Sequence, residues 1–375
     1  MNSTLNRPNS QLLFQRIHGG TDALGLPAFD FSTNSNACGP CPAVQDAVAQ
    51  ADAAHYPDAR YTALRAKLAG FHGCESWRIA IAGSASEFIF RITALAKLQG
   101  VSTVVVPAHC FGDYAHAAQA WGLPLALNGV MDAKQAEKDA ALVWHCQPSS
   151  PLGQVHADVI DVSSNDIHVL DLAYAPLQLS GGAPVDSRLR GNDSGKDGST
   201  EGSNDDSYSA VWQLYSPNKA LGLTGVRAAY AIAPLGLQKS QAMVRQLDGL
   251  SASWPLGAHG VALLDSWVNA DVQSWLSNSL HTLQVWKTRQ TELLESLGWI
   301  CQPSATNFFC ATPNTSKLAS GLTLEQALTA LRQQGIKLRD TTSFGLPGQV
   351  RVSVQPPAAQ DALRQAWQHL TKDFQ

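Results

Sequence analysis

The sequence predicts an α/β fold in two lobes: a large lobe on a mostly parallel β-sheet covered by helices, and a smaller α+β lobe. Three observations support this. A chain of 375 residues is too long for one ordinary core, because compact domains cluster near ~100–200 residues. Short apolar runs alternate with helix-like segments over the first two thirds. The last third is dominated by one long helical stretch and a few strands.

Five short apolar runs, rich in β-forming residues, end abruptly in small or polar residues, as buried strands do. These runs are 77–82, 103–106, 142–146, 167–170 and 210–215. Helix-like segments at 87–98 and 114–121 separate some of them, which gives the β-α-β rhythm of a largely parallel sheet. Ligands of such sheets lie beyond the carboxyl ends of the strands, so residues that follow the strands are candidates for a site.

We expect the small lobe to comprise residues 266–375. A helical stretch at 268–297 precedes strands near 307–310, 336–339 and 350–354, with a helix at 324–333 between the first two strands. Thr323 and Gln326 have the spacing of a capping box for that helix. Residues 1–45 have loop composition and are expected to join the small lobe or to reach across a dimer, which leaves 46–265 as the large lobe. Within it, residues 187–208 are almost devoid of apolar side chains and predict a disordered surface insert.

The composition excludes several classes of protein. Charged residues make up only 15% of the chain, against ~25% in typical soluble domains, so we expect much of the surface to be buried in a homodimer. A net charge of -4 without a basic cluster argues against a nucleic-acid partner. No segment has the ~18 apolar residues of a membrane span, and the start lacks the pattern of a leader. We therefore expect a soluble, cytoplasmic protein without membrane contact, and reduced thiols at its seven cysteines.

Lys219 is the strongest candidate for chemistry. It lies in Ser-Pro-Asn-Lys directly after the predicted strand 210–215, where partial desolvation would lower its pKa and supply a neutral amine for an imine with an aldehyde. Arg227 lies eight residues later, beyond a Gly-Leu-Thr-Gly turn, and can bind a phosphate dianion in fork geometry. A surface lysine in a Gly-rich loop is the alternative, and for this motif alone the two have about even odds.

Other strand ends fit the same chemistry. Asp171 ends the run 167–170, where a carboxylate needs a cation or hydrogen-bond donors; a pyridinium nitrogen would serve, as would nearby amides. Tyr174 can donate to the 3-oxygen of such a ring, or simply pack in the core. Ser84 and Glu87 have capping-box spacing at a helix start whose free N–H groups suit a phosphate. Phe111 is placed to stack on a planar ring, although an aromatic residue there is more often core.

The order of these features resembles the fold-type-I aminotransferases of class I/II, which depend on pyridoxal 5'-phosphate (PLP). The resemblance covers nearly the whole chain and is closest to the branch of histidinol-phosphate aminotransferase and threonine-phosphate decarboxylase. It is carried further by His18-Gly-Gly20, Asp30-Phe-Ser32, Tyr56-Pro-Asp58, Leu338-Arg-Asp-Thr-Thr-Ser-Phe-Gly-Leu-Pro-Gly348 and Val350-Arg-Val352. The first two motifs look more like the decarboxylase, an enzyme of the cobalamin pathway.

The resemblance implies the PLP-dependent transferase fold with a seven-stranded sheet, a homodimer, PLP as cofactor, and a role for each matching residue. Lys219 would be the Schiff-base lysine and proton shuttle, Asp171 the partner of the pyridine nitrogen, Tyr174 a donor to the 3-oxygen and Phe111 the stacking ring. The cofactor phosphate would be held by Ser84, Ala85, Ser86, Ser216 and Arg227, with Tyr56 reaching it from the other subunit. The substrate carboxylate would bind Arg351, and Asn307 would line the same pocket. Apart from the resemblance, His18 is a candidate for contact with the substrate.

Two positions depart from the family pattern. Ser150, in Gln147-Pro-Ser-Ser-Pro-Leu-Gly153, stands where an Asn usually donates to the 3-oxygen, and Asn218 replaces the usual Ser or Thr before the lysine. We expect cofactor binding to survive both changes. The predicted function is decarboxylation of L-threonine O-3-phosphate. The alternatives are transamination of a small phosphorylated amino acid or amino alcohol, as in histidinol-phosphate aminotransferase, and a degenerate relative that binds PLP without turnover.

Cys38-Gly-Pro-Cys41 has the spacing of a redox motif, in which a thiol pKa is lowered. The flanks are loop-like and no strand leads into the motif, so a redox role has odds of roughly one in ten. A single pair of cysteines cannot complete a four-ligand zinc site, and the histidines show no ligand spacing. We expect no metal site.

Overall fold

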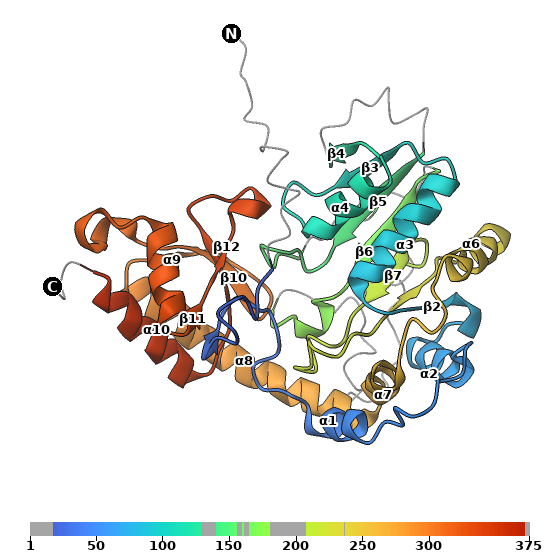
Figure 1. The fold of residues 1–375 in the computed structure, drawn as a ribbon, viewed down its shortest axis with the longest axis horizontal. Helices are drawn as coiled ribbons and strands as arrows, with labels where there is room; N and C mark the ends of the chain where they lie inside the picture. Colours follow the sequence, from blue (N-terminus) through green and yellow to red (C-terminus); the bar gives the residue numbers. More distant parts are fainter. Residues whose placement is uncertain are drawn as a thin grey trace, which may run out of the picture.

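The computed structural model describes residues 18–128, 140–155, 160, 165–180, 208–235 and 237–371. These residues form two lobes that lie side by side (Figure 1). The predicted insert, apart from Tyr208 at its end, lies outside the described residues.

The large lobe is built on a seven-stranded sheet with the strand order β2-β8-β7-β6-β5-β3-β4. The strands are β2 (Ile79–Ala82), β3 (Thr103–Val106), β4 (Leu125–Leu127), β5 (Ala141–Cys146), β6 (Ile167–Asp171), β7 (Trp212–Tyr215) and β8 (Ala229–Ile232). Strand β8 runs antiparallel to both of its neighbours, and the other adjacent strands are parallel. The predicted mostly parallel sheet is confirmed, and β4 and β8 are additional to the predicted strands.

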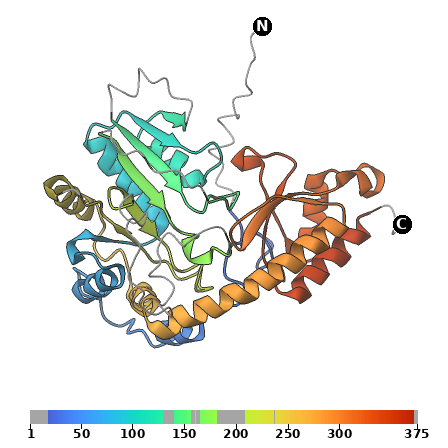
Figure 2. The same cartoon turned by 180° about the vertical axis from the view of Figure 1, so that it is seen from behind.

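Helices cover both faces of this sheet (Figures 1 and 2). They are α1 (Pro42–Ala49), α2 (Thr62–His72), α3 (Ala85–Leu98), α4 (Gly112–Ala120), α6 (Leu237–Gly249) and α7 (Ala258–Trp267). Side chains alternate across a strand, and β2 shows the result: Ile79 and Ile81 belong to a core cluster with α1, α2 and α7, whereas Ala80 and Ala82 belong to one with α3, α4 and α6. Each face of the sheet therefore has its own core.

The small lobe contains a four-stranded antiparallel sheet with the order β12-β13-β10-β9. Its strands are β9 (Ile300–Cys301), β10 (Phe308–Thr312), β12 (Arg339–Asp340) and β13 (Val350–Ser353), with helices α9 (Leu324–Gln333) and α10 (Pro357–His369). A separate parallel pair joins β1 (Phe29–Asp30) to β11 (Ile336–Lys337). The N-terminal segment thus pairs with the small lobe, and the strand predicted at 336–339 is divided into β11 and β12.

Short 3₁₀ helices complete the described elements. They are η2 (Ser76–Arg78), η3 (Ala175–Leu177), η5 (Thr315–Lys317), η6 (Ala319–Gly321) and η7 (Thr342–Phe344).

Two segments connect the lobes. Helix α8 (Ala270–Ser296) runs along both of them, in contact with α1 and α7 at one end and with β9 and α10 at the other (Figure 2). The second connection is the N-terminal crossing, residues 31–41. A Cβ atom added to Gly39 would lie 2.9 Å from the Cα atom of Gly222, whose own φ is +70°, so these two backbones meet where only glycine fits.

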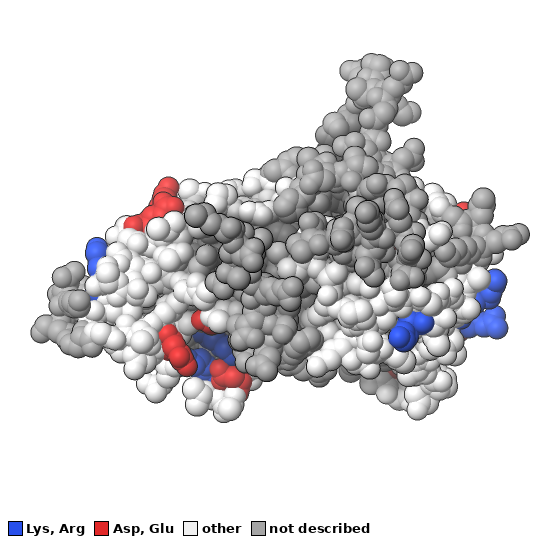
Figure 3. All heavy atoms as spheres, turned by 90° about the horizontal axis from the view of Figure 1, so that it is seen from above, with Lys and Arg blue, Asp and Glu red and all other residues white. Residues whose placement is uncertain are grey.

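The described charges are sparse on the surface. In the view from above, the Lys, Arg, Asp and Glu side chains of the described residues form small groups that are separated by uncharged described residues (Figure 3). Among the described helices, none combines the length and the apolar character that crossing a membrane requires.

Candidate active site

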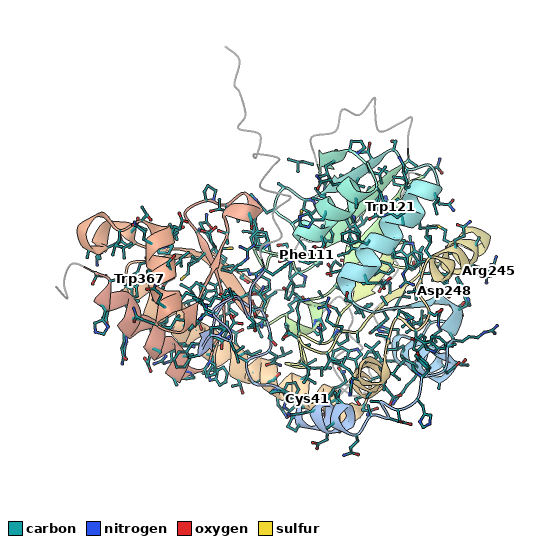
Figure 4. All side chains as sticks on the ribbon, in the orientation of Figure 1. Cys41, Phe111, Trp121, Arg245, Asp248 and Trp367 are labelled. Carbon is teal, nitrogen blue, oxygen red and sulfur yellow. The ribbon has the colours of Figure 1, made fainter. Side chains whose placement is uncertain are left out.

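A cavity of about 380 Å³ lies between the two lobes, beyond the carboxyl ends of β5, β6 and β7. Phe111 lies at its wall, near the junction of the lobes (Figure 4). Of the predicted site residues, the following line it: His18, Ser84, Ala85, Ser86, Phe111, Ser150, Asp171, Tyr174, Ser216, Lys219, Arg227 and Arg351. Strand ends from one sheet thus bring together side chains that are far apart in the sequence.

Asp171 is the buried acid of this cavity, with 5% of its surface exposed. The Tyr114 hydroxyl donates to its Oδ2 atom at 2.7 Å, and the backbone N–H of Ala173 donates to Oδ1 at 3.0 Å. Burial raises the pKa of Asp171, whereas Tyr114, the charge of Lys219 and the N–H of Ala173 act in the opposite direction. A cation beside the carboxylate would favour its charged form further.

Tyr114 was not predicted as a site residue. It is fully buried in α4, and its ring stacks on that of Trp144, with centroids 4.3 Å apart and planes 10° apart. This stacking fixes the hydroxyl that reaches Asp171. The only sequence signal was its place in the first turn of the predicted helix after Phe111.

Lys219 lies in the loop that follows β7. Its Nζ atom donates to the Ser216 hydroxyl at 3.3 Å and lies 5.2 Å from the centre of the Tyr174 ring. The Tyr174 hydroxyl accepts from the amide of Asn34 at 3.3 Å. The structure therefore places the amine, the phenol and the buried acid around one space.

A group of hydroxyl, N–H and guanidinium donors lies beside them. Ser84 caps α3, since its hydroxyl accepts from the N–H of Glu87 at 3.0 Å, and Ala85 and Ser86 begin the helix. Ser216 and the exposed Arg227 line the same cavity as these three residues. No ion pair joins Arg227 to a carboxylate within the described residues, so its charge is available. These donors fit a phosphate dianion.

Two arginines form the small-lobe wall. Arg339 on β12 and Arg351 on β13 are paired across the strands, line the cavity and are 4% and 8% exposed. The Phe344 ring lies 4.6 Å from the Arg339 guanidinium carbon and 5.5 Å from that of Arg351. Burial, with a smaller effect of Arg351, lowers the pKa of Arg339 to about 10. An anion in the cavity would offset the cost of two neighbouring buried cations.

Sequence comparison decides the family. The aminotransferase class I and II family matches residues 27–370, almost the whole chain. The chain belongs to the class I/II aminotransferases. A curated relative of this family, the histidinol-phosphate aminotransferase of Geobacillus thermodenitrificans, is 24% identical over 92% of this chain and 90% of its own.

Two solved structures share the fold of this chain. The L-threonine-O-3-phosphate decarboxylase of Porphyromonas gingivalis has a TM-score of 0.69 at 17% identity, over 90% of this chain and 98% of its own. The histidinol-phosphate aminotransferase of Sinorhizobium meliloti, in complex with pyridoxal-5'-phosphate, has a TM-score of 0.68 at 19% identity. The match covers 92% of this chain and 90% of that chain. The predicted fold class is confirmed.

This class I/II aminotransferase is a PLP-dependent enzyme, and its cavity fits the cofactor. The cavity brings together an amine, a buried carboxylate and a set of donors suited to a phosphate. Among the described residues, no cation forms a hydrogen bond with this carboxylate. In chemical type, Lys219 matches the aldehyde of PLP and Asp171 matches its ring nitrogen. The phosphate matches the donors named above, which are Ser84, Ala85, Ser86, Ser216 and Arg227.

Arg339 is a cavity residue of this aminotransferase that the sequence analysis did not single out. The motif beginning at Leu338 contains it, but an arginine in a short strand is usually solvated, and its partner across the strands could not be known. The cavity therefore has two buried cations on this wall instead of the single predicted Arg351.

Asn307, predicted to line the substrate pocket, is not among the residues that line this cavity. It is fully buried, and its amide donates to the backbone carbonyl of Ser35 in the N-terminal crossing at 2.9 Å. The reason is that the residue before β10 faces the crossing, which could not be placed from the sequence. Asn218 does line the cavity, and its amide lies 3.5 Å and 3.4 Å from the carbonyls of Thr224 and Val226, so it supports the turn that precedes Arg227.

Three other predicted features lie at the edge of the site or outside it. His18 is exposed at the rim, with its ring centre 6.3 Å from that of Phe111. Tyr56 is 78% exposed and stacks on Trp254 away from this cavity; its role in a partner subunit stays a prediction. Burial raises the pKa of Cys38 to about 11 and also raises that of Cys41, opposite to the shift of a reactive redox thiol.

Proposed function

We propose that this protein removes the carboxylate of L-threonine O-3-phosphate. The observation that carries the proposal is the pair of buried arginines, Arg339 and Arg351, which line the same cavity as the donors suited to the cofactor phosphate. A substrate with one carboxylate and one phosphate matches two guanidinium groups. The decarboxylase of similar fold and the His18-Gly-Gly20 and Asp30-Phe-Ser32 motifs support the same choice.

In this proposal each residue has a defined task. PLP, when bound, supplies an electron sink for the pair released from the broken bond. Arg351 is oriented by its hydrogen bond to the Ser32 carbonyl, at 3.1 Å, and would hold the carboxylate that is to be released. Arg339 binds the substrate phosphate. Lys219 delivers a proton from Nζ to the substrate Cα, and Asp171 keeps a positive charge on the ring nitrogen.

Phenol and hydroxyl donors complete the arrangement. Tyr174 would donate to the 3-oxygen of the cofactor, where the buried hydroxyl of Ser150 stands in place of the amide that the family pattern has. Phe111 would stack on the ring. The cofactor phosphate would be held by Ser84, Ala85, Ser86, Ser216 and Arg227.

Transamination of histidinol phosphate is the second candidate. It is favoured by the full-length similarity to curated histidinol-phosphate aminotransferases. The same residues would perform it if the Cα–H bond, instead of the C–CO₂ bond, stood perpendicular to the ring. The third alternative, a relative that binds PLP without turnover, is disfavoured because Lys219, Asp171, Arg227 and Arg351 all line one cavity.

The setting of the reaction is part of the proposal. We propose a cytoplasmic homodimer that acts in cobalamin formation, with the chain divided near residues 45 and 265. The composition and the resemblance to the decarboxylase support these points.

The test supplies threonine phosphate to the PLP-loaded enzyme and follows two products. Release of carbon dioxide, absent in the Lys219→Ala variant, is the expected result. Formation of pyridoxamine phosphate from threonine phosphate or histidinol phosphate, without carbon dioxide, would favour the transaminase. No product with either substrate, in a protein that binds PLP, would favour the non-catalytic alternative.

A further inference from the structure

A second cavity, of about 940 Å³, lies in the large lobe between α2, α6, η2 and the loop 251–255. It shares no lining residue with the active-site cavity. Arg245 and Asp248 on α6 mark its position at the end of the large lobe remote from the small lobe (Figure 4). None of the residues assigned to the reaction lines it, so it needs a separate explanation.

Four arginines line this cavity: Arg60, Arg65, Arg91 and Arg245. The whole chain has only 26 lysines and arginines among 375 residues, so four in one cavity is a marked concentration. Asp248 is the single carboxylate among the described lining residues. The cavity therefore has a positive field in a protein whose net charge is negative.

Two of the arginines are already paired. Asp248 accepts from the Arg65 Nη2 atom with both carboxylate oxygens at 3.1 Å, and Arg65 also donates to the Ile79 carbonyl. The Nε atom of Arg91 lies 2.9 Å from Oε1 of Glu87. These two carboxylates offset two of the four charges.

The guanidinium donors that these carboxylates do not use could bind an anion. Arg91 is 5% exposed, its Nη2 atom donates to the Ile81 carbonyl at 2.6 Å, and its Nη1 atom is buried without a hydrogen-bond partner among the described residues. A buried, unsatisfied donor is costly unless a ligand accepts from it. Arg60 and Arg245 are exposed and form no ion pair with a described residue, so their side chains can turn to an occupant.

We propose that this cavity binds a small, phosphate-bearing anion. Guanidinium groups donate to phosphate oxygens in pairs, and three of them have unused donors here. Trp77 and Trp254 also line the cavity. One face of Trp254 is stacked on Tyr56, so Trp77 is the ring on which a planar base can stack. Its volume accommodates a nucleotide, so the phosphate can come from a nucleotide or from an inorganic polyphosphate.

The test titrates the PLP-loaded enzyme with pyrophosphate and, separately, with ATP in a calorimeter at low salt. Because the substrate arginines can also bind phosphate, the titration is repeated in the variant that carries both Arg339→Gln and Arg351→Gln. We expect binding to persist there and to weaken about tenfold in Arg245→Gln and in Arg60→Gln, as loss of a charge-assisted hydrogen bond predicts. Arg364→Gln, which removes the same charge from α10, is the matched control and should bind like the unaltered enzyme.

The outcomes distinguish a nucleotide site from a polyphosphate site, and both from a subunit contact. Tighter binding of ATP, with quenching of tryptophan fluorescence, would assign a nucleotide site; equal affinity would assign a polyphosphate site. The proposal is overturned if neither anion binds beyond the active site, or if Arg245→Gln binds as tightly as the control. It is also overturned if Arg245→Glu leaves anion binding unchanged but alters the fraction of dimer, which would make the cavity a subunit contact.

Discussion

Tyr114 couples the packing of a helix to the charge of the buried acid. Its hydroxyl lowers the pKa of Asp171, so Tyr114→Phe should raise that pKa. Loss of a hydrogen bond to a charged group costs about 1.5–3 kcal/mol, and we expect kcat/KM to fall roughly 10- to 100-fold. The proposed reaction needs Asp171 in its carboxylate form, so the acid limb of the pH profile should move to higher pH.

The control for this change is Tyr208→Phe, since the Tyr208 hydroxyl accepts from Gln147 at 3.3 Å and does not line the cavity. Its pH profile should match that of the unaltered enzyme. An unshifted acid limb in Tyr114→Phe would show that the hydrogen bond does not control Asp171.

His145 makes folding stability depend on pH. Its ring stacks on that of His168, and burial, with a smaller effect of His168, lowers the pKa of His145 to about 4. The unfolded value is ~6.5, so between these values the unfolded chain binds the additional proton. Stability should therefore fall as the pH decreases from about 6.5 to about 4, by up to about 3 kcal/mol.

Urea unfolding of the His145→Gln variant at pH 7 and pH 5 measures this effect. The variant should lose less stability between the two pH values than the unaltered protein. His259→Gln changes an exposed histidine of α7 and should keep the full difference. An equal loss of unfolding free energy between pH 7 and pH 5 in all three proteins would contradict the prediction.

Much of the cavity could be predicted because its residues directly follow strands. Asp171, Lys219 and Ser84 each come after an apolar run, and the carboxyl ends of those runs meet at one sheet edge. Arg339 and Tyr114 were missed for a different reason. Their positions depend on a strand partner and on helix packing, which involve residues far apart in the chain.

At the level of elements, the cap of α9 was predictable from local sequence. Thr323 accepts from the N–H of Gln326 at 3.2 Å, and the Gln326 side chain accepts from the N–H of Thr323 at 2.9 Å. Thr323→Ala should lower the free energy of unfolding by about 1 kcal/mol, measured by urea denaturation. Thr329→Ala, on the exposed side of the same helix, removes the same atoms without a cap, and an equal loss there would refute the capping explanation.

Strand direction, by contrast, could not be predicted from local pattern. The run Ala229–Ile232 is as apolar as its neighbours, yet β8 enters the sheet antiparallel between β2 and β7. The division between β11 and β12 has a similar origin, because β11 pairs with β1 and β12 pairs with β13. Pairing of distant segments decided both features.

At the level of the whole molecule, Tyr56 tests the proposed dimer. If Tyr56 completes the phosphate site of the partner, co-expressed Lys219→Ala and Tyr56→Ala chains will form hybrid dimers with one intact site. Activity should then exceed that of either variant alone. Lys219→Ala combined with Asp171→Ala is the control, because both residues line the cavity of one chain; it should restore nothing. Absence of recovery in the first pair would place Tyr56 outside the partner's site.

The meeting of Gly39 and Gly222 gives the Cys38-Gly-Pro-Cys41 sequence a meaning unrelated to sulfur. The N–H groups of Asn36 and Cys41 donate to the carbonyls of Lys219 and Leu221 at 2.9 Å and 2.8 Å. These hydrogen bonds hold residues 36–41 against the loop that contains Lys219. A methyl group at position 39 would collide with the backbone of that loop. In this motif the close backbone contact requires Gly39, whereas the contact does not involve the two thiols.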